Sequence, residues 1–411
     1  MKNIPIMIPY FSEDEISNIA DVLKSGWVAQ GPKVTDFENA VAAHEKVGFG
    51  IGTTSCTTAL HLALVAMGIG EGDDVIVPSF TFIATANAVT YTGATPILVD
   101  IDENTFNISI QSVLKKIEEG YTRNSAKNVF ENKKTGNALK AIIPVHLFGL
   151  CANIPEINRI AQEYKLLVLE DAACALGAKI GEIHQGGFGN PSCLSFHPRK
   201  SITTGEGGMV LTDNKELADR IKILRTHGAS VSAANRHKKG GYLLPDFDEL
   251  GFNYRMTDIQ AAVGIAQIKK FDWITEERRK KVRKYNNLLK EIAWIKTPTE
   301  PEGYFHTYQS YVCMINTEAL RCKTTEDANE FRNQMMEKLE ENGIATRQGT
   351  HAVHLLNYYK NKYNLATDYC INAYKADKLS LTLPLYVQMN DDDQEYVVDN
   401  IKKITNQFEG R

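Results

Sequence analysis

The stretch SFHPRKSITTGEGG at residues 195–208 places one lysine between a short apolar strand and a glycine-rich turn. The apolar residues 193–196 predict the strand, and the glycines that close the stretch allow backbone to approach a ligand closely. Lys200 is therefore a candidate nucleophile. An amine becomes reactive when desolvation, or a second cation nearby, makes its neutral form accessible. Because an isolated loop lysine is usually only solvated, the assignment depends on a second residue upstream.

That second residue lies in LLVLEDAACALG at residues 166–177, an apolar strand that ends in acidic residues followed by small ones. In open α/β sheets the carboxyl ends of buried strands face the crevice in which ligands bind. Asp171 stands at that edge. Its carboxylate can cap the next turn, or it can hold a ring nitrogen protonated. Pyridoxal phosphate requires a protonated ring nitrogen, because the protonated ring withdraws electrons from the reacting carbon.

The remaining pattern predicts an α/β fold in two domains. Apolar strands alternate with helical stretches up to about residue 270, which indicates a mostly parallel sheet with right-handed crossovers. We expect a large cofactor-binding domain with an N-terminal arm at 1–270 and a smaller α+β domain at 271–411. Two polar segments interrupt the pattern. Residues 121–140 predict an exposed insertion, and residues 226–244 predict a flexible segment.

Composition narrows the class of protein. The 411 residues are 43% apolar and 23% charged, with a net charge of -4 spread over both signs, which is typical of soluble globular proteins and disfavours nucleic-acid binding. The sequence has neither a membrane-length apolar stretch nor a signal-peptide core, so we expect a cytoplasmic protein without membrane contact. Its seven cysteines form no CxxC pair. We therefore expect no disulfide framework, no zinc site and no other bound metal.

Further motifs accompany these two in a fixed order: GWVAQGPKVTDFE (26–38), PSFTFIATANAV (78–89), PVHLFG (144–149), GFNYRMTDIQAAVGIAQ (251–267) and LPLYVQM (383–389). Together they resemble the pyridoxal-phosphate-dependent nucleotide-sugar aminotransferases, often labelled DegT-like. Each motif is weak alone, but their order and spacing over nearly the whole chain are specific. The resemblance implies a fold-type-I transferase whose active sites are shared between the subunits of a homodimer.

The hydroxyl-rich turn TTSCTT at residues 53–58 precedes a helical stretch. A helix N-terminus offers unpaired N–H groups and a positive dipole end, so the turn is either an anion site or a plain Ser/Thr cap. The resemblance assigns the cofactor phosphate to it, around Cys56 and Thr57, with the Ser195 hydroxyl completing the site. By the same resemblance Asn253 reaches the phosphate of the other subunit, ahead of the small residues 261–264, which suit close packing.

The resemblance also assigns the contacts of the cofactor ring. Phe82 would stack on one face of the ring, and Ala173 would lie beneath the other. Cys174 stands where relatives usually have Gln or His to hydrogen-bond the phenolic oxygen of the cofactor. A thiol is a poor donor, so the partner of that oxygen is open.

On the substrate side the resemblance points to Trp27, His197, His306 and Arg347. A packing role for Trp27 and surface roles for His306 and Arg347 fit the sequence equally well. The implied reaction moves an amino group from glutamate to a keto sugar on a nucleotide diphosphate, at C4 of a 4-keto-6-deoxy sugar, by a ping-pong mechanism. Lys200 would bind the cofactor aldehyde covalently and then transfer a proton.

Two alternatives remain open. Sugar dehydratases of the same family carry histidine in place of the lysine, so Lys200 argues against that activity. The second alternative is a non-catalytic regulatory protein that binds pyridoxal phosphate. It stays open because Cys174 replaces the usual Gln or His.

Overall fold

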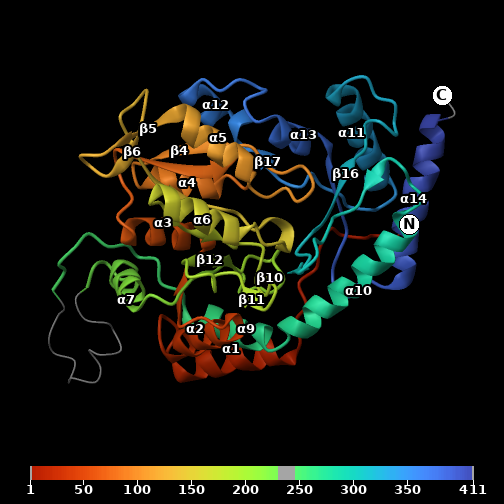
Figure 1. The fold of residues 1–411 in the computed structure, drawn as a ribbon. Coiled ribbons are helices and arrows are strands. Elements are labelled where there is room, and N and C mark those ends of the chain that lie inside the picture. Colours follow the sequence, from red (N-terminus) through yellow and green to blue (C-terminus); the bar gives the residue numbers. More distant parts are fainter. Residues whose placement is uncertain (1, 230–245, 410–411) are drawn as a thin grey trace.

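The structure is a computed structural model that describes residues 2–229 and 246–409, and a six-stranded sheet crosses its larger part (Figure 1). The strands run in the order β4 (Thr95–Val99), β2 (Asp73–Pro78), β7 (Ala138–Ile142), β6 (Val129–Asn132) and β5 (Tyr121–Asn124), and β8 (Leu167–Val168) also pairs with β7. The pairs among β4, β2, β7 and β8 are parallel. The pairs of β5 with β6 and of β6 with β7 are antiparallel.

The antiparallel hairpin corrects one expectation. Residues 122–123, 125–128 and 133–136 are exposed, as expected, but the segment is not an irregular insertion, because β5, β6 and the start of β7 extend the sheet. Three of its polar side chains bond to the fully buried Asp74, which accepts hydrogen bonds from the Tyr121 hydroxyl (2.8 Å) and from the amides of Asn132 (2.6 Å) and Asn137 (2.9 Å). Because a buried carboxylate needs hydrogen-bond donors, polar residues at these three positions stabilise the fold.

A second sheet carries the two motifs of the predicted site. Its order is β1 (Phe49–Thr53), β13 (Gly208–Thr212), β12 (Ser192–Ser195) and β9 (Glu170–Asp171). Only β12 and β9 are parallel; β13 runs antiparallel to both its neighbours. A parallel bridge between Val145 and Asp171 links this sheet to the first. The expected parallel centre is present, but antiparallel strands at both edges make the curled sheet mixed.

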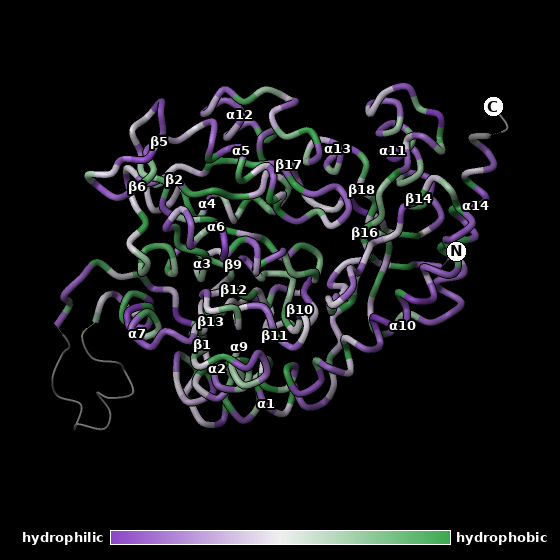
Figure 2. The backbone as a smooth tube through the Cα atoms, in the orientation of Figure 1, coloured by the Kyte–Doolittle hydropathy of each residue, from purple (hydrophilic) through white to green (hydrophobic). Residues whose placement is uncertain are grey.

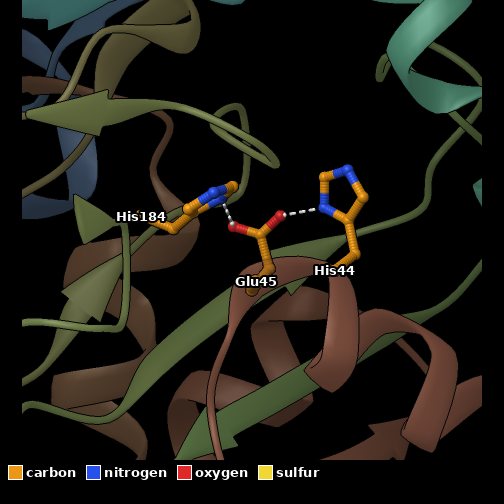
Figure 3. Close-up of side chains that lie close together, drawn as sticks. All are labelled: His44, Glu45 and His184. Atoms are coloured by element: carbon orange, nitrogen blue, oxygen red, sulfur yellow. Dashed lines mark hydrogen bonds and ion pairs between the residues drawn. The ribbon is translucent and has the colours of Figure 1, made fainter. Parts of the chain in front are cut away.

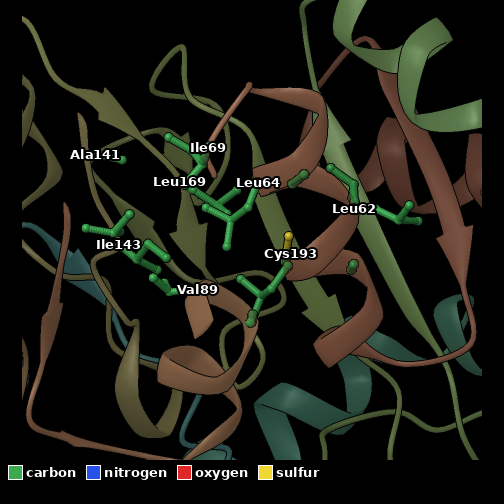
Figure 4. Close-up of a cluster of buried hydrophobic side chains, with 14 of the residues drawn as sticks. Leu62, Leu64, Ile69, Val89, Ala141, Ile143, Leu169 and Cys193 are labelled. Carbon is green, nitrogen blue, oxygen red and sulfur yellow. The ribbon is translucent and has the colours of Figure 1, made fainter. Parts of the chain in front are cut away.

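Helices cover the sheets on both sides. Those of the larger part are α1 (Glu13–Ser25), α2 (Pro32–Glu45), α3 (Cys56–Ala66), α4 (Ala84–Tyr91), α5 (Ile110–Gly120), α6 (Ile154–Tyr164), α7 (Lys215–Leu224) and α9 (Asp258–Ile268). Helix α3 is apolar nearly all round and packs between the sheets, with Leu64 on the side of Leu169 and Ile143 and Leu62 on the opposite side of the helix (Figure 4). This burial fixes the helix N-terminus in position.

The small residues of α9 have a partner within the chain. Helices α2 and α9 pack closely, and a Cβ added at Gly264 would lie 2.5 Å from Phe37 Cζ. The close packing expected of residues 261–264 is therefore made with α2, so those residues do not by themselves indicate a subunit interface.

The smaller part begins with α10 (Phe271–Leu289). It contains an antiparallel sheet of β14 (Ile295–Lys296), β16 (Tyr311–Ile315) and β18 (Ser380–Leu383), covered by α11 (Thr325–Glu341) and α14 (Asp391–Glu409). Its hydrophobic cluster includes Ile4, which forms a parallel bridge with Ile344. The N-terminal arm thus packs on the C-terminal part.

One C-terminal segment returns to the larger part: β17 (His351–Ala352), α12 (Asn357–Tyr363) and α13 (Ile371–Leu379). Strand β17 pairs with β3 (Phe80–Thr81), and the fully buried Tyr359 belongs to the hydrophobic core around α3. The start of α10 coincides with the predicted boundary at 271. The division into two domains stays a prediction, because segments of the chain cross that boundary in both directions.

Figure 2 shows hydrophobic stretches along the central strands and hydrophilic residues on the outer helices and loops. Within residues 2–229 and 246–409, no helix is both long and apolar enough to cross a membrane. The segment 226–244, expected to be flexible, lies largely outside the described residues.

Candidate active site

A pocket of about 800 Å³ lies where the ends of β9 and β12 meet α3, α4 and segments of the smaller part. Ten of the predicted site residues line it: Cys56, Thr57, Phe82, Asp171, Ala173, Cys174, Ser195, His197, Lys200 and Arg347. Trp27, Asn253 and His306 are not among its lining residues. The motifs from four separate stretches of the large part therefore converge on one cavity.

Asp171 ends β9 and is 4% exposed. Its Oδ2 accepts a hydrogen bond from the Thr85 hydroxyl (2.7 Å), and its Oδ1 accepts one from the Ala173 N–H (3.1 Å). Burial raises the pKa of Asp171, although these two hydrogen bonds and the nearby Lys200 work in the opposite direction. The carboxylate is thus fixed in orientation and gains from any further cation placed beside it.

Lys200 follows a turn in which its N–H donates to the His197 carbonyl (2.8 Å). Its Nζ lies 3.0 Å from Cys174 Sγ. Burial lowers the pKa of Lys200, but Cys174 and, further away, Asp171 outweigh burial, and the net effect is a raised pKa. The raised pKa favours the charged amine, so desolvation alone does not supply the neutral form that a nucleophilic lysine needs.

The glycine-rich turn brings the lysine close to the start of α3. Gly205 has a φ of +81°, which favours glycine. A Cβ at Gly208 would lie 2.3 Å from the carbonyl carbon of Ser55, so only glycine fits where β13 passes the helix. Both positions thus require glycine, which explains why the turn is rich in glycine.

The N-terminus of α3 faces the pocket. The Ser55 hydroxyl accepts from the Thr58 N–H (3.2 Å), and the Thr58 hydroxyl accepts from the Ser55 N–H (3.0 Å), which completes a capping box. The N–H groups of Cys56 and Thr57 belong to the first turn, where a helix supplies no partner of its own. Phe82 lies at the edge of the same pocket with its side chain 63% exposed.

His197 is half-buried in the pocket. Its Nδ1 accepts from the Arg199 N–H (3.2 Å), and its Nε2 lies 4.0 Å from Glu206. Burial lowers the pKa of His197, and Lys200 and Arg199 add to that effect against Glu206. The lowered pKa favours the neutral imidazole, and because Nδ1 accepts a hydrogen bond, Nε2 carries the proton.

The three residues outside the pocket differ from one another. Trp27 is 43% exposed, and its Nε1 donates to the Gln30 carbonyl (3.2 Å). Asn253 is exposed in the segment before α9. His306 is 3% exposed and stacks on Tyr308 with 3.8 Å between ring centroids. Burial and the charge of Arg279 lower the pKa of His306 to about 3, so it is a neutral core residue.

Some residues that line the pocket were not predicted, because they lie in no recognisable sequence motif. Thr85 lies in the first turn of α4, and its hydroxyl contacts that of Thr81 at the end of β3, so no helical or strand spacing of the sequence indicated it. Gln309 Nε2 donates to the Arg199 carbonyl across 110 positions of sequence, and Ile6 and Met7 enter from the N-terminal arm. Contacts between such distant segments depend on the tertiary fold.

This arrangement is that of a fold-type-I transferase dependent on pyridoxal phosphate. More narrowly, the chain belongs to the DegT/DnrJ/EryC1/StrS aminotransferase family, whose model matches residues 9–402. The resemblance to sugar aminotransferases inferred from the sequence is thereby confirmed, as is the expected fold type.

Characterised relatives cover nearly all of the chain. It is 36% identical to a GDP-perosamine synthase of Escherichia coli O157:H7, over 88% of this chain and 89% of that one. It is 32% identical to the UDP-4-amino-4-deoxy-L-arabinose–oxoglutarate aminotransferase of Shewanella sediminis, over 98% of both chains. Among solved structures, the putative sugar aminotransferase Spr1654 of Streptococcus pneumoniae in its PMP form has a TM-score of 0.87 and 25% identity, covering 98% of this chain and all of that one.

The pocket fits the cofactor of the family. The start of α3 and the Ser195 hydroxyl offer donors for a phosphate, and the fixed Asp171 carboxylate suits a protonated ring nitrogen. Lys200 supplies an amine, and the exposed ring of Phe82 supplies an apolar face. A volume of about 800 Å³ leaves room for a substrate beside the cofactor.

Proposed function

We propose that this sugar aminotransferase moves an amino group from glutamate to C4 of a 4-keto-6-deoxy sugar carried on a nucleotide diphosphate. The observation that carries the proposal is Lys200 in one pocket with Asp171 and with His197. The relative from Shewanella sediminis supports two details, because its name places the amine at C4 and pairs the reaction with oxoglutarate, the keto acid of glutamate.

Bound pyridoxal phosphate supplies an electron-withdrawing ring and an aldehyde. Asp171 would keep the ring nitrogen of that group protonated, with Thr85 and Ala173 fixing the orientation of its carboxylate. Lys200 would hold the aldehyde, and its amine, when free, would move the proton at the α-carbon of the amino donor. The same lysine serves the return half-reaction with the keto sugar.

The remaining cofactor contacts follow from the lining of the pocket. Cys56 and Thr57 offer backbone N–H groups to the phosphate, and Ser195 offers its hydroxyl. Phe82 and Ala173, which both line the pocket, would contact opposite faces of the ring.

Cys174 Sγ lies 3.0 Å from Lys200 Nζ. If Lys200 holds the cofactor, this thiol would be close to the phenolic oxygen. We assign Cys174 as the contact of that oxygen, a weak donor in place of the usual amide or imidazole.

The outer side of the pocket binds the substrate. Arg347 is exposed at the pocket rim, and a guanidinium suits a carboxylate or a diphosphate. The Nε2–H of His197 is placed to donate to a sugar oxygen. Trp27 contacts substrate only if a loop of a second subunit brings it to the pocket, and the position of His306 in the core favours a packing role.

Cofactor absorbance tests this function directly. We expect glutamate alone to convert the absorbance band of the loaded enzyme, and a nucleotide-linked 4-keto sugar to restore it with formation of an amino sugar, identified by mass spectrometry. A band that glutamate does not change would indicate a non-catalytic binder. Loss of a sugar hydroxyl without gain of nitrogen would indicate a dehydratase.

We also propose a homodimer with shared sites. Asn253 is exposed, lies outside the pocket of its own chain and precedes α9. A phosphate with up to two negative charges needs more donors than the helix end and one hydroxyl supply. Mixing Lys200→Ala with Asn253→Ala subunits creates some heterodimers with one intact site, so activity should recover. Verified heterodimers without recovery, or full activity in a verified monomer, would contradict sharing.

A further inference from the structure

A second cluster of chemically active side chains lies apart from the pocket. His44 and Glu45 stand at the end of α2, and His184 lies on β11 (Ile183–His184), which forms a hairpin with β10 (Lys179–Ile180). Figure 3 shows both imidazoles turned toward the Glu45 carboxylate. The possible ligand atoms of the three residues all lie within 4.8 Å of one another. None of the three lines the cofactor pocket.

One atom of this cluster is left unsatisfied. His184 Nδ1 is buried without a hydrogen-bond partner, and the side chain is 9% exposed. The nearest acceptor is Glu45 Oε2, at 3.6 Å, which is too long for a hydrogen bond. A buried ring nitrogen without a partner costs free energy, so native proteins usually pair such a group or use it to bind a ligand.

We propose that His44, Glu45 and His184 bind one Zn²⁺ ion. Two imidazole nitrogens and a carboxylate oxygen are a common ligand set for zinc, with water in the fourth position. The lone pair of His184 Nδ1 then has a partner. Hard cations such as Mg²⁺ prefer oxygen ligands throughout, so they fit the site less well.

The surroundings of the cluster hold each ligand in place. The Nε2 of His44 pairs with Asp272 Oδ1 at 3.0 Å, and its Nδ1 is hydrogen-bonded to Glu45 Oε1, a contact that a bound metal would replace. The Glu45 carboxylate accepts hydrogen bonds from the Gly177 N–H (3.0 Å) and from Gln185 Nε2 (2.7 Å). Zinc sites depend on such outer contacts, which orient the ligands and set the tautomer of a histidine.

The ligand spacing requires a small movement. His44 Nδ1 and Glu45 Oε1 are 2.7 Å apart, a hydrogen-bond distance, whereas tetrahedral zinc with bonds of about 2.0–2.1 Å separates its ligand atoms by about 3.3 Å. A sub-ångström rotation of the partly exposed His44 ring closes the difference. His44 and Glu45 lie 139 or more positions from His184, and no cysteine takes part. The expectation of no metal rested on cysteine spacing and did not consider this combination.

The site joins three elements: the end of α2, the β10–β11 hairpin, and the start of α10 through Asp272. Helix α10 leads from the larger part to the smaller one, so bound zinc stabilises their junction. Because the cluster is separate from the cofactor pocket, zinc is expected to change stability and to leave transamination nearly unchanged.

The test uses the cofactor-loaded enzyme after chelator treatment, titrated with zinc chloride in a calorimeter and melted with and without the ion. We expect one zinc per chain and a melting temperature higher by about 3–8 °C in saturating zinc. His184→Ala and His44→Gln should lose both effects. His61→Gln should keep both, because His61 is a buried imidazole on α3 outside the cluster.

Equal zinc binding by wild type and His184→Ala, or no binding by wild type at 100 µM zinc (about 10⁻⁴ M, the weak limit for a specific site), would overturn the proposal. If the variants do not fold, a second measurement on the wild-type protein still tests the site. Anomalous scattering at the zinc edge from wild-type crystals should place the ion between the three side chains, and zinc found only elsewhere would equally refute the site.

Discussion

The two walls of the pocket are built in different ways. The inner wall consists of strand ends and helix starts of the large part, and its central carboxylate, Asp171, is buried with a donor on each oxygen. The outer wall combines residues 6–7, 309–310, 347–350 and 382–385, and it leaves Arg347 exposed. The first wall holds charged groups rigidly for chemistry, whereas the second offers adaptable polar contacts. We infer that the inner wall sets the reaction and the outer wall selects the sugar.

Lys200→Ala should have the largest effect, because it removes the group that we propose both binds the aldehyde and moves the proton. Multiple-turnover transamination should disappear, together with the absorbance band of cofactor bound to the lysine. The measurement is a coupled assay for 2-oxoglutarate, with far-UV circular dichroism as the control for folding. Turnover near that of the wild type would reject the assignment of Lys200.

Asp171→Asn should follow, with a loss of at least ~10²-fold in kcat, the size of single electrostatic contributions in other active sites. Asparagine keeps the geometry, since its oxygen can accept from Ala173 and its amide can donate to the Thr85 hydroxyl, but it lacks the charge that holds the ring proton. A variant within a few-fold of the wild type would mean that another group retains that proton.

The same variant tests the pKa of Asp171 through stability. Burial raises this pKa above the usual 3.8, so the ionised carboxylate opposes folding, and that cost grows as pH rises through the folded-state pKa. The cofactor-free Asp171→Asn protein should therefore melt no lower than cofactor-free wild type at pH 7, and the advantage should vanish below pH 3.8. A clearly lower melting temperature at pH 7 would show that the carboxylate stabilises the fold.

The contrast between the walls also explains which residues of the site could be predicted from the sequence. The inner wall was predictable because each part lies in a contiguous motif: an apolar strand ending in Asp171, a hydroxyl-rich helix start, and a glycine turn required at Gly205 and Gly208. These local rules act within about fifteen residues. The outer wall was not predictable, because Gln309 meets Arg199 only in the folded chain.

Two parts of the fold depend on partners that local composition does not identify. Residues 121–140 are polar, but they form strands of the sheet, and Tyr121 bonds to Asp74, a buried residue some fifty positions earlier. The small residues of α9 pack closely, as expected, and Gly264 does so on Phe37 of the same chain. In both cases local composition was correctly described, and the identity of the contacting partner decided the structure.

On the outer wall, Arg347→Ala should raise KM for the substrate it binds by about tenfold, the value of one charge-assisted hydrogen bond, and should change kcat less than threefold. Steady-state kinetics with each substrate varied in turn shows whether the guanidinium meets the glutamate carboxylate or the nucleotide diphosphate. Arg347→Lys keeps the charge but loses the two parallel N–H donors of the guanidinium, so its KM should lie between those of the wild type and of Arg347→Ala. A fall in kcat with KM unchanged would place Arg347 with the inner wall.

Cys174 stands at the border between the walls, and its replacement should have the smallest effect. A hydroxyl donates a stronger hydrogen bond than a thiol does, so Cys174→Ser should stabilise the ionised phenolic oxygen of the bound cofactor. The pH at which the cofactor band titrates should then fall, while kcat changes only a few-fold. Cys174→Ala, which has no donor, should move that midpoint in the opposite direction. The measurement is a spectral titration without substrate, which reports on the contact even if activity does not change. Identical midpoints in all three proteins would show that the thiol, although 3.0 Å from Lys200 Nζ, does not touch the phenolic oxygen.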